Sequence, residues 1–125
     1  MFTNFTFRTA NKISFGTGTI EQVGAELKAA GATNTMLVTD KTIRNAGWAE
    51  KIQGILKASD IRSTIWDQAE AEPSVEIGDK AVDAARSGGF DSIIGLGGGS
   101  AMDIAKAAAV GLTNEGHIMG WIRGG

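Results

Sequence analysis

The stretch from residue 92 to residue 112 constrains the fold most, because a short apolar run, three glycines and a helix-like repeat succeed one another there. Ile93, Ile94 and Leu96 predict a central strand that is buried on both faces. The next three residues have no Cβ, so their backbone can turn sharply and approach a ligand closely; they are Gly97, Gly98 and Gly99. A strand, a glycine turn and a helix N-terminus predict a phosphate site, and an ordinary tight turn is the alternative.

The helix after the glycines begins with a cap-like pattern. Ser100 is a good N-cap and Asp103 lies three residues after it, so the two approximate a capping box. Apolar residues then recur at helical spacing: Ile104, Ala105, Ala108 and Leu112. The stretch is not the dinucleotide fingerprint G-x-G-x-x-G, because position 100 is Ser, and it is not a P-loop, because no G-K-[ST] comes after it.

Strand-like and helix-like segments alternate along the rest of the chain. Phe5, Phe7, Ile13 and Phe15 predict an N-terminal β-hairpin. An apolar run then predicts a strand at 36–39, alternating residues predict one at 61–65, and helical spacing predicts helices at 20–30, 48–56 and 75–85. This order predicts an α/β fold, with a Rossmann-like parallel sheet and flanking helices.

Composition limits the classes of protein to which the chain can belong. Its 125 residues support one small domain, 1–125, and the net charge of −2 without a basic patch argues against nucleic acid as a partner. The chain has no cysteine, and no apolar run approaches 18 residues, so we expect neither disulfides nor a membrane segment. The polar N-terminus is not a signal peptide, and a cytoplasmic location is expected. The glycine-rich last twelve residues predict a chain cut inside a larger domain.

Asp40 comes directly after one of the predicted strands. Ligands of open α/β sheets bind beyond the carboxyl ends of the strands. A carboxylate there can accept both ribose hydroxyls of an adenosine, and it would repel the 2′-phosphate of NADP. The alternative is that Asp40 caps the next helix, and the residues alone leave both interpretations open.

The segment GGGSAMDIAK, residues 97–106, resembles the GGGSxxDxAK signature of the iron-dependent (group III) alcohol dehydrogenases. Val38-Thr39-Asp40 matches the step at which that family places the acid that selects NAD, and the IxFGxG opening at residues 13–18 is also similar. The resemblance covers only the first third or so of such an enzyme. It implies NAD, with NADP less favoured, bound by one group of residues: Asp40, Glu72, Gly97, Gly98, Gly99, Ser100, Ala101, Met102 and Asp103.

Glu72 and Asp103 are the other two acids of this group. Glu72 stands where the family usually has the Asn of Pro-Asn-Pro, which contacts the cofactor near its nicotinamide end, so that contact stays open and a solvated loop acid is the alternative. Asp103 lies at a helix N-terminus, which favours its ionised form and makes it a poor proton donor. Its expected role is to organise the loop that meets the pyrophosphate.

No catalytic residue and no metal ligand is expected in this chain. His117 is the only histidine, and no nucleophile–base pair or metal cluster can be assembled from the sequence. The resemblance implies that iron or zinc is held by one Asp and three His of a helical domain that this chain lacks. We therefore expect the NAD(P)-binding portion of an enzyme, compatible with a homo-oligomer, that interconverts an alcohol and its aldehyde or ketone. The alternatives are a stand-alone nucleotide-binding protein without catalysis and an assembly module.

Overall fold

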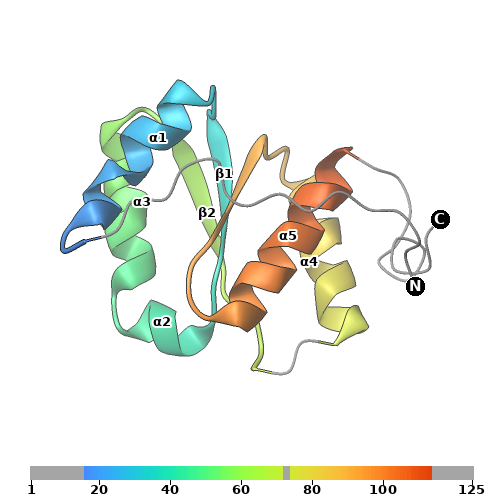
Figure 1. The fold of residues 1–125 in the computed structure, drawn as a ribbon. Helices are drawn as coiled ribbons and strands as arrows, with labels where there is room; N and C mark the ends of the chain where they lie inside the picture. The colour runs from blue at the N-terminus through green and yellow to red at the C-terminus, as the bar shows by residue number, and fades with distance from the viewer. Residues whose placement is uncertain (1–15, 72–73, 114–125) are drawn as a thin grey trace, which may run out of the picture.

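The computed structural model describes residues 16–71 and 74–113, and strands and helices alternate there as predicted (Figure 1). The predicted hairpin at residues 5–15 lies outside the described residues, as do Glu72 and His117. The elements, in chain order, are η1 (Thr19–Gln22), α1 (Val23–Ala29), β1 (Asn34–Val38), α2 (Lys41–Asn45), α3 (Trp48–Ala58), β2 (Arg62–Trp66), α4 (Val75–Ser87), β3 (Ser92–Gly95) and α5 (Gly99–Thr113).

The sheet of the described residues has three parallel strands in the order β2-β1-β3. Val38, the last residue of β1, lies opposite Trp66 of β2 and Gly95 of β3. Because the strands are parallel and in this register, their carboxyl ends lie side by side at the same end of the sheet. This is the end at which open α/β sheets bind ligands.

Helices cover both faces of the sheet. In Figure 1, α1, α2 and α3 lie on one face, and α4 and α5 lie on the other. Side chains alternate along β1, so Met36 and Val38 pack into a core with α4 and α5, whereas Leu37 packs into a second core with α3. The α/β fold class predicted from the sequence is confirmed.

The strand before the glycines packs on both faces, since Ile93 contacts the core with α4 and α5, whereas Ile94 and Leu96 contact the core with α3. The prediction that it is central was wrong for the described part of the sheet. Within the described residues, β1 is the central strand and β3 lies at an edge of the sheet. All four residues of β3 are half-buried, because only one of its edges is paired with a strand there. The apolar run of this segment nevertheless fits the helix layers on both of its faces.

Two helix boundaries depend on backbone turns. Gly31, which comes directly after the C-cap of α1, has a φ of +86°, and Gly47, with a φ of +89°, separates α2 from α3. A positive φ of this size favours glycine over residues with a Cβ. The sequence pattern predicted a helix at 48–56, which is α3, and the structure adds the short helix α2 before the turn at Gly47.

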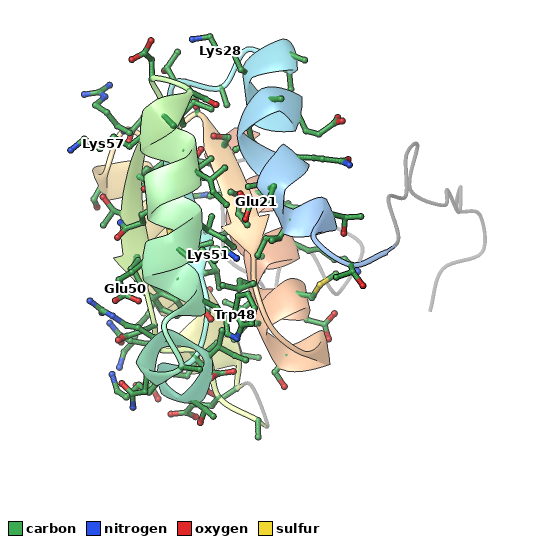
Figure 2. All side chains as sticks on the ribbon, turned by 90° about the vertical axis from the view of Figure 1, so that its left-hand side faces the viewer. Glu21, Lys28, Trp48, Glu50, Lys51 and Lys57 are labelled. Atoms are coloured by element: carbon green, nitrogen blue, oxygen red, sulfur yellow. The ribbon has the colours of Figure 1, made fainter. Side chains whose placement is uncertain are left out.

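On the outer surface of the molecule, a charged contact joins α3 to η1, and Figure 2 labels its two residues, Lys51 and Glu21. Lys51 Nζ lies 3.3 Å from Glu21 Oε1 and 5.3 Å from the centre of the Trp48 ring. Exposed pairs of this kind contribute about 0–1 kcal/mol each, so apolar packing carries most of this interface. Among the described residues, none of the helices has the length and apolar character needed to cross a membrane.

Candidate functional site

A cleft of about 890 Å³ lies at the carboxyl ends of the strands. Three segments line it, one after each strand: residues 40–42, residues 67–71 and residues 98–101. Ile77 and Lys80 of α4 complete the lining. The structure therefore brings together five of the residues that the sequence singled out: Asp40, Gly98, Gly99, Ser100 and Ala101.

The three glycines differ in what the fold requires of them. Gly97 has a φ of +136°, and a Cβ placed on it would lie 3.4 Å from the Cβ of Ala101, so the turn itself calls for glycine. Gly98 and Gly99 have no positive φ, and a Cβ on either would meet no atom within 4 Å. The described residues thus give no steric reason for glycine at 98 and 99. Because residues 98 and 99 have no side chain, a ligand can approach the backbone at the start of α5 closely.

Ser100 does not cap the helix, so the predicted capping box was wrong. The helix α5 begins one residue earlier, at Gly99, and the Met102 amide donates to the Gly98 carbonyl at 3.1 Å. The Ser100 hydroxyl instead donates to the Ala71 carbonyl at 2.7 Å. Because α5 begins at Gly99, Ser100 lies inside the first turn of the helix, and its hydroxyl joins residue 71 to the start of α5.

Asp40 is half-buried and is the N-cap of α2. Its Oδ1 accepts a hydrogen bond from the Ile43 amide at 2.8 Å, which confirms the capping interpretation for this oxygen. Its Oδ2 lies 3.6 Å from the position that a Cβ would take on Gly97. One oxygen of the carboxylate therefore caps α2, and the other lies beside the glycine turn. Whether it also binds a ribose stays a prediction.

A second carboxylate, Asp67, comes after β2 as Asp40 comes after β1. It accepts hydrogen bonds from Arg44 Nη1 at 2.9 Å and from Lys41 Nζ at 3.2 Å. The Arg44 hydrogen bond, and then that of Lys41, lowers the pKa of Asp67 below its ordinary value, and Asp67 in turn raises the pKa of Arg44. Asp67 therefore stays ionised at neutral pH and balances two cations beside the cleft.

Sequence reasoning missed this ionic group. The signal was present, because Trp66-Asp67 ends a predicted strand just as Thr39-Asp40 does. The cations that pair with Asp67 could not be predicted from such a pattern, because the helical turn of α2 brings Lys41 and Arg44 to the same carboxylate.

The other predicted site residues lie elsewhere or outside the described part. Met102 is 45% exposed and lines a separate groove with Ile93 and Lys106. Asp103 is exposed on α5 and is not among the residues that line the cleft. A part for these two residues and for Glu72 in binding stays a prediction. The described residues contain no group of three or more His, Cys, Asp or Glu side chains that could hold a metal ion.

Comparisons with known proteins agree on one family. The family model described as iron-containing alcohol dehydrogenase matches residues 10–124. Among curated relatives, the long-chain-alcohol dehydrogenase 1 of Geobacillus thermodenitrificans is 35% identical over 107 residues, which are 86% of this chain and 27% of that protein. The sulfoacetaldehyde reductase of Bilophila wadsworthia is 37% identical over 114 residues, which are 91% of this chain and 30% of that protein.

A solved structure supports the same relationship. The NADH-dependent butanol dehydrogenase A of Thermotoga maritima superposes with a TM-score of 0.82 at 33% identity, over 92% of this chain and 29% of that one. The chain therefore spans less than a third of the length of these relatives.

Proposed function

The chain belongs to the iron-containing alcohol dehydrogenase family, and we propose that it forms the NAD(P)-binding portion of a metal-dependent alcohol dehydrogenase, with the cofactor held in the cleft at the carboxyl ends of the strands. One observation carries this proposal. Gly98 and Gly99 line the cleft although neither steric crowding nor a positive φ requires glycine there. Backbone that is left bare at the start of a 15-residue helix is suited to an anionic ligand such as a pyrophosphate.

Two parts of the cleft would hold two parts of the cofactor. The backbone N–H groups at Gly98, Gly99 and Ser100 would bind the pyrophosphate, since the helix dipole and the free amides both favour an anion there. The Asp40 carboxylate beside them would accept the ribose hydroxyls, and hydrogen bonds to an ionised acceptor are stronger than neutral ones. A bound nicotinamide supplies the hydride acceptor or donor of the reaction.

We infer a preference for NAD over NADP from the charge of Asp40. The 2′-phosphate of NADP would bring about two negative charges toward that carboxylate. The Thermotoga relative is NADH-dependent by name, which supports the same choice.

The metal that the family name implies does not fit the described residues, which lack a group of three or more candidate ligands. We propose that iron or zinc is bound by parts of the enzyme beyond this chain. No catalytic step is assigned to the residues described.

The substrate class is inferred from the family. We propose the interconversion of an alcohol and its aldehyde or ketone. Relatives of nearly equal identity to this chain carry names that refer to long-chain alcohols and to sulfoacetaldehyde. This supports a shared cofactor-binding portion, with the choice of substrate made by the rest of the protein.

A fluorescence titration tests the cofactor role. Purified protein is added to NADH and the emission of the reduced nicotinamide is followed. NAD, which does not emit, serves as the competitor, and AMP tests whether the adenosine half alone competes. We expect saturable binding that NAD reverses. Emission that stays unchanged at protein concentrations of about 1 mM would contradict the proposal, because that concentration corresponds to only about 4 kcal/mol of binding free energy.

A further inference from the structure

We propose that Thr39 is a positioning residue for the cofactor cleft, a role that rests on the proposed function of that cleft. The Thr39 side chain fixes the point at which the glycine turn leaves the sheet. It does so from beneath the cleft, since Thr39 is fully buried and is not among the residues that line it.

Thr39 makes hydrogen bonds to the segments at the carboxyl ends of both neighbouring strands. Its N–H donates to the Trp66 carbonyl at 2.9 Å, and its carbonyl accepts from the Ala69 amide at 3.1 Å. Its hydroxyl donates to the Leu96 carbonyl at 2.8 Å. Any residue other than proline at this position could make the first two bonds, so only the bond to Leu96 depends on the side chain.

The bond to Leu96 matters because Leu96 directly precedes the glycine turn. The Leu96 amide donates to the Val38 carbonyl at 2.9 Å, and the Leu96 carbonyl accepts from Thr39, so both polar groups of this residue are tied to the end of β1. The next residue is Gly97, with a φ of +136°. Glycine resists rotation less than other residues, so an anchor immediately before it sets the direction in which the amides of 98–100 point.

Loss of the Thr39 hydroxyl would leave the Leu96 carbonyl without this hydrogen bond. The peptide group between Leu96 and Gly97 could then rotate more freely. Binding that relies on several convergent amides is sensitive to shifts of about 1 Å in their placement. The expected consequence is weaker cofactor binding with the cleft lining itself unchanged.

The other end of the same strand pair offers a matched control. Thr35 is also fully buried on β1, and its hydroxyl bonds to the Ser92 hydroxyl of β3. The residue type, the burial and the pair of strands are the same. Thr35, however, lies toward the amino ends of the strands, away from the cleft.

The test compares Thr39→Val, Thr39→Ser and Thr35→Val with the wild-type protein. For each, the dissociation constant for NADH and the thermal unfolding midpoint are measured. Thr39→Val should weaken NADH binding by about tenfold, and Thr39→Ser, which restores the hydroxyl, should stay within about threefold of wild type. Thr35→Val should lower the unfolding midpoint to a similar extent as Thr39→Val and leave the dissociation constant unchanged.

The outcomes distinguish the positioning role from the proposed function. Unchanged NADH affinity in a folded Thr39→Val protein overturns the positioning role, and so does equal loss of affinity in Thr35→Val. If neither Thr39→Val nor Thr39→Ala folds while Thr35→Val does, Thr39 serves the fold as a whole and the proposal is wrong.

A wild-type protein that binds no NADH contradicts the proposed function alone. Amide hydrogen exchange at residues 97–99 then decides the positioning role. Faster exchange there in Thr39→Val than in Thr35→Val supports it, and equal exchange overturns it.

Discussion

Asp40 and Gly97 face each other at the carboxyl edge of the sheet, with Asp40 Oδ2 3.6 Å from the position that a Cβ would take on the glycine. The two residues are far apart in the sequence and become neighbours because β1 and β3 pair directly. The acid proposed to bind the ribose therefore lies next to the turn proposed to bind the pyrophosphate, as the connected parts of one dinucleotide require.

A side chain on Gly98 should obstruct the proposed pyrophosphate site. Gly98→Val should weaken NAD binding by at least about tenfold, or about 1.4 kcal/mol, as measured by calorimetry. The unfolding midpoint should change little, because a Cβ there meets no protein atom within 4 Å. Gly54 is the matched control, since it is exposed on α3 and equally uncrowded. If Gly98→Val and Gly54→Val bind NAD alike, the phosphate role of the turn is lost.

The charge of Asp40 should set the preference between the two cofactors. Asp40→Ser removes the charge and keeps an N-cap for α2, because serine caps helices about as well as aspartate. The ratio of NADP to NAD dissociation constants should fall by about tenfold, with a larger change at low salt where repulsion is less screened. Paired titrations with NAD and NADP measure this ratio. A ratio equal to that of wild type would mean that Asp40 is a helix cap only.

Asp67 should weaken the binding of NADP, because the 2′-phosphate of NADP adds negative charge near this carboxylate. Asp67→Asn removes the carboxylate that pairs with Lys41 and leaves Arg44 with Glu50 alone, so NADP binding should strengthen by about two- to fivefold at low salt. The salt dependence of the NADP dissociation constant is the measurement. Glu50→Gln is the control, because Glu50 also pairs with Arg44, at 3.3 Å, but does not line the cleft. Equal effects of the two substitutions would argue against a local role for Asp67.

Asp91 should make the stability of the fold depend on pH in the acid range. Its carboxylate accepts hydrogen bonds from the Thr33 hydroxyl and from the amides of Thr33 and Asn34. These bonds, that of the Thr33 side chain foremost, lower the pKa of Asp91 from 3.8 to about 2.

Because the pKa is lower in the folded state, the stabilisation is complete above the ordinary value of 3.8 and is lost as the pH falls toward about 2. Urea unfolding of wild type and Asp91→Asn across this range should show a difference in the free energy of unfolding that is constant at neutral pH and shrinks in acid. Asp83→Asn, on the exposed face of α4, should change the free energy little. A difference between wild type and Asp91→Asn that does not change with pH would contradict the assignment.

The local elements of the fold could be predicted from the sequence, and its long-range arrangement could not. An apolar run predicted β1 and helical spacing predicted α4 and α5, because each pattern depends on residues close in the chain. The strand order is different in kind. Nothing local in residues 92–96 reveals that β3 pairs only with β1 among the described strands, and so the segment was wrongly predicted to be central.

The same division holds within the candidate site. Asp40 and the glycines were predicted because a strand end with an acid or glycines directly after it is a local pattern. The Ser100 hydroxyl was expected to cap its own helix, and it bonds to Ala71 because the fold places that carbonyl within its reach. The bond from Thr39 to Leu96 joins two strand ends, and no spacing in the sequence indicates it.

The binding of a nicotinamide dinucleotide at the glycine turn is tested most directly by amide chemical shifts measured during an NAD titration. We expect saturable shifts for the amides of Gly98, Gly99 and Ser100 and of residues 40–42. Residues at the amino ends of the strands, such as Arg62 and Ser63, should not shift. Shifts confined to those amino ends, or none at the glycine turn at saturating NAD, would contradict binding at this turn.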